Sequence, residues 1–384
     1  MKNLAIFTGA DVRYFTGGHR TALELTKIKD FNVTVFSYIG KKGLRMSLKE
    51  LKNYIGINGN LYFYRTLKFY IINLPITYSG IKAFLAIKNF DTVYNMDNTI
   101  TSILLLTFIC KIYKKKLILG LHDADLFTNN RNIVSEKRTI RDLTKILYIK
   151  FRTITYLIVP NIRVVNREYI SKLRKIGYNK KIYFIPDLIF AKPNRVKINK
   201  KKFIVLFTGR LDIKHKGIDL LCKMIDIILQ KSTNIEFNIA GSGSEGKDLI
   251  HLLEIKYPKN VKWFGFVSNK KLKRLYENSC LFIFPSRIES FGLSLAEAQI
   301  YGLPAIAFNI RGPKMIIKIK IQGELIPPFN IEKFVRSIFR YYNIWSKNKS
   351  YYLNIKREIS KAMKFRFNDN VTLIQLSKMF DPKL

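Results

Sequence analysis

The sequence is poor in several residue types, and each shortage argues against a class of protein. Its 384 residues include only 3 cysteines, Cys110, Cys222 and Cys280. They are far apart and odd in number, so we expect neither a disulfide framework nor a zinc cluster. Long hydrophobic runs are also missing, since the longest, around Ile103 to Cys110, is too short to cross a bilayer. A strand-like run begins almost at the first residue, without a signal peptide, and we therefore expect a cytoplasmic protein.

What the chain has is length and a regular alternation of segments. With 384 residues, of which 48% are hydrophobic, it can fill two cores. Apolar strand-like runs alternate with amphipathic helix-like segments, a rhythm typical of parallel sheets covered by helices on both faces. The rhythm pauses in a basic stretch that contains proline. We therefore predict an α/β chain with a first domain at 1–187, a linker at 188–202, a second domain at 203–353 and a last helical segment at 354–384.

The most informative stretch holds two carboxylates, Glu289 and Glu297, with seven residues between them. The apolar run Leu281–Phe284 before it predicts a buried strand, and Phe291-Gly292 leads into a helix. The free N–H groups at the start of such a helix can hold a phosphate. Taken singly, Glu289 also fits a solvated loop charge and Glu297 a charge on a helix surface.

Three further strand ends carry motifs of the same kind. Phe203–Phe207 predicts a buried strand, and it is followed by Gly209-Arg210 and, six residues later, by Lys216. An arginine offers phosphate a planar fork, whereas a lysine offers a point charge. A Gly-x-Gly turn at Gly241 and a turn after Val261 follow in order. One such motif is weak evidence, but four in this order indicate a sugar-nucleotide site.

Together these motifs lie between Phe203 and Pro313, a range that also includes Gly302-Leu-Pro304. They resemble the C-terminal domain of retaining glycosyltransferases of family 4. That family has the GT-B fold, in which two Rossmann-like domains face each other across a cleft. The resemblance implies that Arg210 and Lys216 bind the donor diphosphate, that Glu297 binds the ribose, and that Glu289 contacts the donor sugar as a catalytic residue. It also implies backbone contacts to the donor from Ser290, Phe291, Gly292 and Leu293, and a turn beside the base at Phe266 and Val267.

The N-terminal half fits the same family less closely. Gly17 and Gly18 are predicted to lie in a loop before a helix that starts near Thr21, where paired glycines let backbone approach a donor. Leu117–Leu121 predicts a strand that ends at His122, a position where the family often has a histidine near the donor sugar. We assign His122 a catalytic role on that basis. A histidine satisfied by hydrogen bonds within the core is the alternative.

The resemblance further implies an activity. It is the transfer of a hexose-type sugar, with retention, from a nucleotide sugar to a glycan or lipid-linked glycan, as in the synthesis of O-antigen, lipopolysaccharide or capsule. The departing diphosphate takes the proton of the acceptor, so we expect no metal and no cofactor beyond the nucleotide sugar. The terminal helix of this family crosses back to the first domain. Ile185-Pro186-Asp187 and Arg311-Gly312-Pro313 depart from the usual motifs and leave the donor sugar open.

The charge is strongly unbalanced, with 68 basic and 27 acidic residues and a formal net charge of +41. Coding bias accounts for part of this excess, but the field still attracts anions. The segment from Lys137 to Tyr156 mixes cations with large apolar side chains, as an interfacial helix does, although a helix packed on a sheet gives the same pattern. We expect a peripheral protein on the inner face of the cell membrane. The alternatives are a sugar-nucleotide epimerase and a nucleic-acid-binding protein, and the chain has no sequence signature for the latter.

Overall fold

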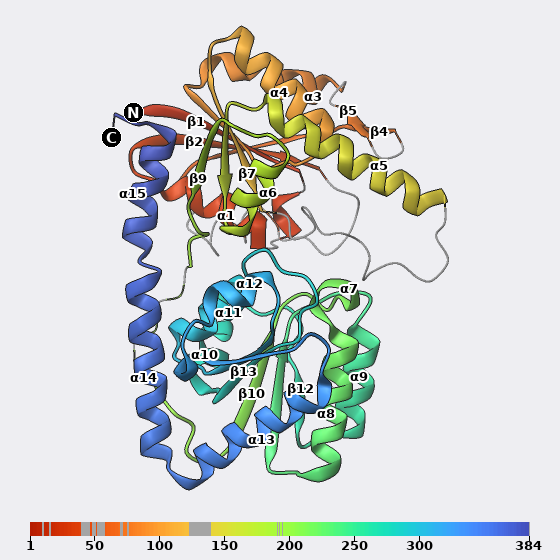
Figure 1. Ribbon diagram of the computed structural model, residues 1–384, viewed down its shortest axis with the longest axis vertical. Coiled ribbons are helices and arrows are strands. Elements are labelled where there is room, and N and C mark those ends of the chain that lie inside the picture. Colours follow the sequence, from red (N-terminus) through yellow and green to blue (C-terminus); the bar gives the residue numbers. More distant parts are fainter. Residues whose placement is uncertain are drawn as a thin grey trace. The chain divides into compact units, whose positions relative to one another are not determined.

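The computed structural model describes residues 1–9, 11–14, 17–39, 47, 51, 58–69, 72–74, 77–122, 140–189, 191, 193 and 195–383. The chain forms two compact units (Figure 1). Unit 1 combines Met1–Leu188 with Asn370–Leu384, and unit 2 is Ile189–Asp369. Each unit contains its own parallel sheet with helices on both faces, so the predicted pair of Rossmann-like α/β domains is confirmed.

Unit 1 is built on a seven-stranded sheet in the order β3-β2-β1-β6-β7-β8-β9, in which every neighbouring pair is parallel. Its strands are β1 (Lys2–Thr8), β2 (Phe31–Tyr38), β3 (Asn60–Tyr64), β6 (Thr92–Asn95), β7 (Lys116–Leu121), β8 (Asn161–Val164) and β9 (Lys181–Phe184). A small antiparallel pair, β4 (Leu67–Phe69) and β5 (Ile72–Leu74), stands apart. The chain order reverses at β1, which lies between β2 and β6.

The helices of unit 1 follow the strands, as a parallel sheet requires. They are α1 (Gly17–Glu24), α3 (Tyr78–Leu85), α4 (Ile100–Ile112), α5 (Ile140–Thr155), α6 (Glu168–Lys175) and α15 (Asp369–Phe380), with short 3₁₀ turns at Val12–Tyr14, Leu25–Lys27, Ala86–Asn89 and Tyr156–Ile158. Part of the interfacial segment proposed from the sequence, residues 137–139, lies outside the described residues. No helix in the described ranges is both long enough and apolar enough to span a bilayer.

Unit 2 is built on a six-stranded parallel sheet in the order β12-β11-β10-β13-β14-β15. Its strands are β10 (Phe203–Thr208), β11 (Ile235–Ala240), β12 (Val261–Trp263), β13 (Leu281–Phe284), β14 (Ala305–Phe308) and β15 (Gly323–Ile326). Its helices are α7 (Ile213–Lys216), α8 (Ile218–Lys231), α9 (Lys247–Lys256), α10 (Asn269–Asn278), α11 (Leu293–Ile300), α12 (Arg311–Ile316), α13 (Ile331–Lys347) and α14 (Lys349–Arg366), with a 3₁₀ turn at Lys320–Gln322.

The core of unit 2 explains why its central strands read as continuous apolar runs. Phe203, Val205 and Phe207 of β10 point to one face and pack in a fully buried cluster with side chains of α8 and α13. A strand covered on both faces has no solvated side, so alternation disappears and only the length of the run remains as a signal. The loops at the carboxyl edge of the sheet therefore extend from a close-packed core.

Two helices, α14 and α15, form the end of the chain, where the sequence predicted one helical segment at 354–384. The helical stretch breaks at Phe367–Asn368, between α14 and α15. Arg366 donates to the carbonyl of Ile316 at 2.9 Å, which ties the end of α14 to unit 2. α15 instead packs in unit 1, where Lys116 donates to the carbonyl of Met379 at 2.6 Å. The chain thus returns to unit 1 at Asn370.

Candidate active site

The carboxyl ends of β10 and β13 define the candidate site in unit 2. These two strands are neighbours in the sheet, although β11 and β12 come between them in sequence, so the chain order reverses there. Ligands of open α/β sheets bind outside the carboxyl ends of the strands at such a reversal. Arg210 and Lys216 follow β10, and Glu289 follows β13. The topology therefore places three of the sequence-predicted site residues at the expected edge.

Close backbone packing shapes the loop after β10. Gly241, which follows β11, has φ +146°, and a side chain there would collide with the carbonyl oxygen of Gly209. The two loops can approach this closely only because position 241 is glycine. Gly217 plays the same part at the end of α7, because its left-handed φ of +67° lets it sit against the carbonyl of Pro285. α7 is thereby fixed beside the loop that carries Glu289.

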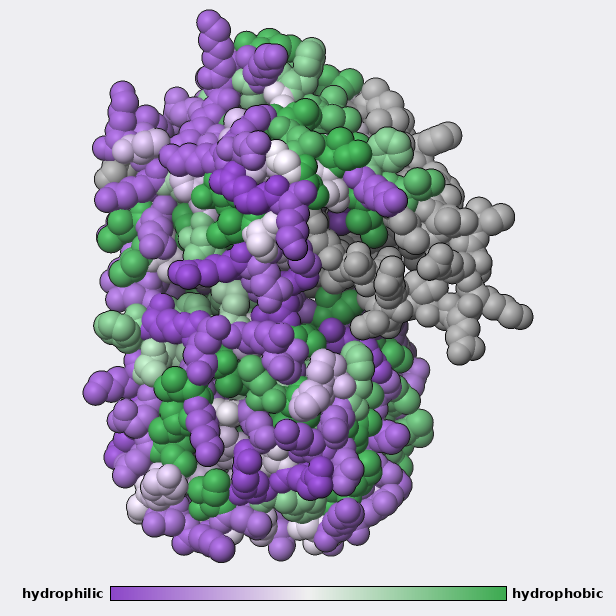
Figure 2. Space-filling view, in the orientation of Figure 1, coloured by the Kyte–Doolittle hydropathy of each residue, from purple (hydrophilic) through white to green (hydrophobic). Residues whose placement is uncertain are grey.

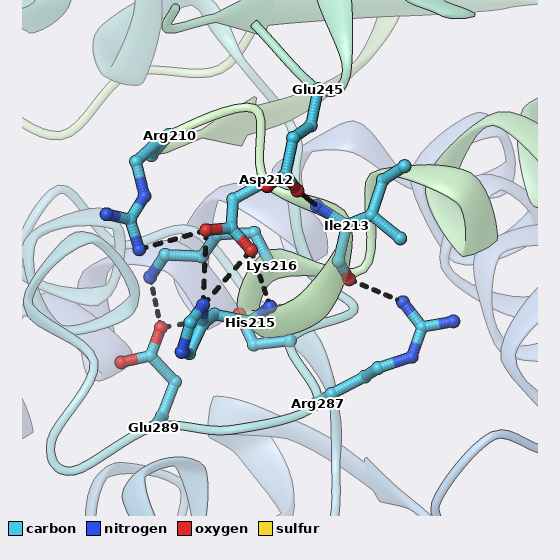
Figure 3. A network of polar contacts seen from close by, with 9 residues as sticks. Arg210, Asp212, Ile213, His215, Lys216, Glu245, Arg287 and Glu289 are labelled. Atoms are coloured by element: carbon cyan, nitrogen blue, oxygen red, sulfur yellow. Dashed lines mark hydrogen bonds and ion pairs between the residues drawn. The ribbon is translucent and has the colours of Figure 1, made fainter. Parts of the chain in front are cut away.

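Asp212 orients the first cation of the site. Its carboxylate caps α7 by accepting from the backbone N–H of His215 at 2.6 Å, and it lies 3.1 Å from a ring nitrogen of the same histidine. A guanidinium nitrogen of Arg210 lies 3.1 Å from its other oxygen (Figure 3). Burial would raise the pKa of Asp212, but the His215 hydrogen bonds and the Arg210 charge outweigh it and lower that pKa. The Arg210 side chain remains about half exposed, at 51%.

Lys216 and Glu289 form an ion pair in the middle of the site (Figure 3). Both side chains are mostly buried, with 19% and 12% of their surfaces exposed. Ser286 donates to the same carboxylate oxygen at 3.4 Å, and the Lys216 ammonium lies 5.2 Å from the ring centre of Phe284. The structure thus brings together a cation from the β10 loop and an acid from the β13 loop, 73 residues apart in sequence.

Arg287 joins the same two loops, and the sequence analysis did not single it out. It donates at 2.6 Å and 2.7 Å to the two carboxylate oxygens of Asp219 in α8, and at 2.6 Å to the carbonyl of Ile213. These hydrogen bonds lower the pKa of Asp219. A bidentate pair has defined geometry as well as charge, so Arg287 fixes α7 relative to the β13 loop. Its position two residues before Glu289 was the available signal.

Glu297 lies on the buried side of α11, with 5% of its surface exposed. The hydroxyl of Tyr276 donates to its carboxylate at 3.1 Å and lies 2.9 Å from the hydroxyl of Thr208, the last residue of β10. Glu297 is therefore connected to the carboxyl end of the central strand. A charge on the helix surface, the alternative considered from sequence, is excluded by this burial. Tyr276, on α10, was missed because its contact depends on strand order.

The residues between the two glutamates lead into α11. Gly292 has a left-handed φ of +101°, and α11 begins directly after it at Leu293. Ser290 and Leu293 are half-buried, whereas the Phe291 ring is buried and packs edge-on against Phe367 at 5.7 Å. The first-turn N–H groups of α11 have no side-chain cap at Gly292. Such N–H groups favour an anion.

The proposed base-adjacent residues lie two strands away from β10, after the edge strand β12. Phe266 is 54% exposed and Val267 is buried. The intervening turn has Gly265 at φ +60°. The turn is joined to the loop after β11, because the N–H of Gly241 donates to the carbonyl of Gly265 at 2.8 Å.

In unit 1 the structure corrects the predicted loop at Gly17 and Gly18 and shows His122 at its predicted place after a strand. Gly17 and Gly18 do not lie in a loop that continues to Arg20, because α1 already begins at Gly17. Glycine disfavours helix interiors, but at the first turn its backbone N–H groups need no helical partner, so the helix extends over both glycines. His122 directly follows β7, as predicted.

His122 belongs to a buried polar cluster that the sequence did not reveal. Its Nε2 lies 2.7 Å from the Tyr94 hydroxyl, and its Nδ1 lies 3.2 Å from a carboxylate oxygen of Asp187. Arg163, which is fully buried, donates to the Tyr94 hydroxyl at 2.8 Å and to the Asp187 carboxylate at 3.2 Å. Burial raises the pKa of Tyr94 to about 12. Burial alone would raise the pKa of Asp187 too, but His122 and Arg163 together lower it.

Clusters suited to a metal ion are not found in the part of the chain that the structure describes. No three histidine, cysteine, aspartate or glutamate side chains there lie close enough together to hold one. Arg210 and Lys216 are two cations of the site that can neutralise a diphosphate. The arrangement can therefore hold an anion between the loops after β10 and β13. The buried carboxylate of Glu297 lies on the next helix, α11.

Residues 189–358 match the family model described as glycosyl transferases group 1. An uncharacterised 41.2 kDa protein in the cps region of Klebsiella pneumoniae is 33% identical over 195 residues, which cover 49% of this chain and 50% of that protein. The poly(ribitol-phosphate) alpha-N-acetylglucosaminyltransferase of Staphylococcus aureus is 31% identical over 168 residues, covering 42% of this chain and 34% of its own. The chain thus spans half or less of the length of these relatives.

Solved structures extend the likeness to both units. A mutant of the S. aureus protein TarM, in complex with Fondaparinux, alpha-GlcNAc-glycerol and UDP, superposes with a TM-score of 0.77 at 14% identity, over 99% of this chain and 100% of that one. Identity this low shows the fold alone. The chain has the GT-B fold, and its residues 189–358 are similar to the glycosyl transferases group 1 model.

Proposed function

We propose that the protein is a retaining glycosyltransferase that moves a hexose-type sugar from a nucleotide sugar to a glycan or lipid-linked glycan. The observation that carries the proposal is the Lys216–Glu289 pair, with Arg210 beside it, at the point where the chain order of the sheet reverses. A diphosphate fits there because two cations and the first-turn N–H groups of α11 surround one edge of the sheet.

The roles follow from burial and charge. The diphosphate replaces Glu289 as the partner of Lys216, while the half-exposed Arg210 takes further phosphate oxygens. Glu297, already oriented by Tyr276, accepts the ribose hydroxyls. Both cations neutralise the charge that develops on the leaving nucleoside diphosphate, where fixed charges lower the barrier most. The acceptor hydroxyl attacks from the leaving-group side and passes its proton to a diphosphate oxygen, so no metal or further cofactor is needed.

Glu289 and His122 are proposed to contact the donor sugar. Once the diphosphate releases Glu289 from Lys216, its carboxylate is free to accept a sugar hydroxyl. The Nε2 of His122 lies 2.7 Å from the Tyr94 hydroxyl and its Nδ1 faces the Asp187 carboxylate at 3.2 Å, so these two neighbours orient its ring before any substrate arrives. Gly17 and Gly18 are proposed to offer the backbone of the first turn of α1 to the donor.

A screen of nucleotide sugars tests the activity. UDP-, GDP- and ADP-sugars are added singly to the whole protein, and the unfolding temperature is measured, since a ligand that binds the native state raises it. We expect one nucleotide to raise it clearly, and its sugar to be transferred with retention to a glycan acceptor. Release of the free sugar without any acceptor would instead indicate an epimerase, and no stabilisation by any nucleotide would contradict the proposal.

Surface polysaccharide assembly is the proposed setting. The Klebsiella relative is named for a cps region, and the staphylococcal relative for transfer to poly(ribitol-phosphate). An acceptor of this kind is assembled where a cytoplasmic enzyme meets the inner face of the membrane. We therefore propose a cytoplasmic protein that works at that face.

The apolar surface of α4 and α5 is the proposed membrane contact. Leu104, Phe108 and Ile112 repeat every four residues on α4, and they are 45%, 63% and 58% exposed. Phe151 and Ile154 on α5, which contacts α4, are 62% and 59% exposed. Hydrophobic residues also stand among hydrophilic ones on the face in Figure 2. The exposed Lys111 and Lys150 on the same helices suit an anionic surface.

Vesicle flotation tests the membrane contact. Wild-type protein should float with anionic vesicles and much less with neutral ones, and replacing Phe108 and Phe151 by serine should weaken the binding at least about tenfold. Phe365→Ser is the matched control, because Phe365 is 89% exposed but lies on α14 in unit 2. Equal flotation of all proteins, or equal recovery with both vesicle types, would contradict this part of the proposal.

A further inference from the structure

An open groove with charged residues in its lining lies in unit 2, on the face of the sheet beside α10. Its volume is about 650 Å³. Ile204 of β10, Asn238 of β11, Lys262 of β12 and Leu275 of α10 line it. None of the residues that line it is Arg210, Lys216, Glu289 or Glu297. We call this cavity the α10 groove.

Strand alternation explains why the floor of the α10 groove is polar. Phe237 and Ile239 of β11 point into the hydrophobic core, so the residues between and beside them face the opposite side of the sheet. Those residues are Glu236 and Asn238, and Lys262 occupies the matching position on β12, paired with Asn238. A strand that only needed to pack under a helix would carry apolar side chains on this side as well.

Five cations and one acid line the α10 groove. Lys202 is paired with Glu236 at 2.5 Å, and the Lys271 ammonium lies 4.7 Å from the ring centre of Phe264. Lys262, Lys270 and Arg274 are exposed, and no ion pair is recorded for them in the described part of the chain. The groove therefore presents several uncompensated positive charges.

The floor of the α10 groove also offers an amide, that of Asn238. The residue is only 8% exposed, and it lines the groove together with the apolar side chains of Ile204 and Leu275. Its amide forms no hydrogen bond within the described part of the chain, yet it is not sealed in the core, because it is not among the buried polar atoms that lack a partner. A ligand in the groove would therefore meet it.

The cations are spread out rather than converging on one point. Lys202 precedes β10 at the amino edge of the sheet, whereas Lys270 stands in the first turn of α10, after the carboxyl end of β12. A strand the length of β10, with 6 residues, spans roughly 20 Å. A single phosphate cannot contact both ends. A chain that carries negative charges at intervals can.

We propose that the α10 groove binds an anionic glycan chain, that is, a remote segment of the acceptor whose growing end is elongated at the proposed active site. This inference rests on the proposed function and names its acceptor class. Carboxylate or phosphate groups of the chain pair with Lys262, Lys270 and Arg274, and a sugar hydroxyl or ring oxygen meets the amide of Asn238. A nucleic acid fits less well because bases bind by stacking on open aromatic faces. The one aromatic ring that lines the groove, Phe264, already has Lys271 over it.

A binding assay without donor tests the inference separately from the activity. The probe is a fluorescent decamer of galacturonic acid, measured by anisotropy at 0.15 M salt with the whole protein. The methyl-esterified decamer is the neutral comparison, and a ten-nucleotide single-stranded DNA is the other polyanion. In the first variant Lys262, Lys270 and Arg274 are all changed to glutamine. Its matched control carries Lys223→Gln, Lys231→Gln and Lys361→Gln, which remove the same charge from exposed positions elsewhere in unit 2.

Asn238→Leu is a third variant, which separates binding from folding. Leucine has the same branched shape as asparagine and breaks no hydrogen bond within the described part of the chain, so the unfolding temperature should stay near that of the wild type while affinity for the decamer falls. Stabilisation by the nucleotide that emerges from the donor screen should be unchanged in all three variants. A groove that fails this test would thus leave the proposed donor site standing, and the reverse also holds.

We expect the wild type and the control variant to bind the acidic decamer alike and the esterified decamer weakly. The groove variant should bind the acidic decamer at least tenfold more weakly, and Asn238→Leu at least threefold more weakly. Equal binding by the groove and control variants would overturn the proposal, because the overall field of the protein would then suffice. Tighter binding of the DNA than of the acidic decamer would overturn it in favour of a nucleic-acid site.

Discussion

The two units both carry charged clusters at strand ends, but the clusters differ in how tightly they are closed. In unit 1, Arg163 is fully buried and is held by Asp187, the Tyr94 hydroxyl and two backbone carbonyls. In unit 2, Lys216 and Arg210 keep part of their surface exposed and each contacts one carboxylate. The cluster in unit 1 holds the segment after β9 in place through Arg163. In the cluster in unit 2, a ligand can replace Glu289 as the partner of Lys216.

That difference predicts opposite responses to mutation. Removal of a cation from the closed cluster should cost stability, and removal from the open cluster should cost function.

Arg163→Met should lower the free energy of unfolding by roughly 3 to 5 kcal/mol, because it removes the guanidinium that pairs with the buried carboxylate of Asp187 and leaves that charge undercompensated. Chemical denaturation at pH 7 measures the effect. The double variant with Asp187→Asn is the control and should recover part of the loss, since the uncompensated charge is then gone. A loss below about 1 kcal/mol would show that the cluster of unit 1 is not closed.

Lys216→Ala should lower kcat/KM by an amount equivalent to roughly 2 to 4 kcal/mol, while the unfolding temperature stays within a few degrees of wild type. Lys214→Ala is the matched control, because Lys214 lies on the same helix, is exposed and has no ion pair recorded for it. Steady-state kinetics with the donor found in the nucleotide screen checks this. Equal losses in both variants would mean that general charge, rather than the site, is responsible.

Lys356 sharpens the comparison, because it is a buried cation in unit 2 without a carboxylate. It is fully buried in α14 and donates to the carbonyl of Ser279 at 2.8 Å. Burial lowers its pKa from 10.5 to about 8. Between pH 8 and 10.5 the unfolded chain therefore binds more protons at this group, and the unfolding free energy it contributes rises with pH.

Lys356→Met should accordingly stabilise the protein at pH 7, by roughly 2 kcal/mol once the lost hydrogen bond to Ser279 is subtracted. The advantage over wild type should shrink as the pH rises from about 8 toward 10.5. Denaturation curves at pH 7 and at pH 9.5 measure it. An advantage that is constant with pH would contradict the assigned cause.

Glu297→Ala should have the smallest effect, a rise in the KM for the donor equivalent to roughly 1 to 2 kcal/mol, with kcat nearly unchanged. A ribose contact is made equally in the ground and transition states, so its loss affects binding alone. Glu297→Gln keeps one acceptor oxygen for Tyr276, so its donor KM should lie between those of the wild type and of Glu297→Ala. A fall in kcat without a change in KM would exclude the ribose role.

The candidate site of unit 2 was accessible from sequence because its residues directly follow strands. Arg210 and Lys216 come after β10 and Glu289 after β13, and parallel strands bring their carboxyl ends to one edge whatever their order. The fold was predictable for the same reason, since long buried runs identify the strands. Arg287 was missed although it stands two residues before Glu289, because its partner Asp219 is 68 residues away.

The closed cluster of unit 1 was not accessible. Tyr94, Arg163 and Asp187 lie on β6, on β8 and after β9, and they meet only because β6 and β8 flank β7 in the sheet and β9 pairs with β8. Sequence gives neither that order nor the burial of an arginine. The start of α1 at Gly17 and the break between α14 and α15 were also missed, since glycine signals a loop more often than a first helical turn and Phe367 carries no break signal.

The central claim is that a nucleoside diphosphate replaces Glu289 as the partner of Lys216. The most direct test is calorimetric titration of the nucleoside diphosphate from the donor screen into wild type, Lys216→Ala and Glu289→Gln. Glu289→Gln should bind it at least as tightly as wild type, because the competing carboxylate is gone, and Lys216→Ala should bind it at least tenfold more weakly. The same Kd in all three proteins would contradict the claim.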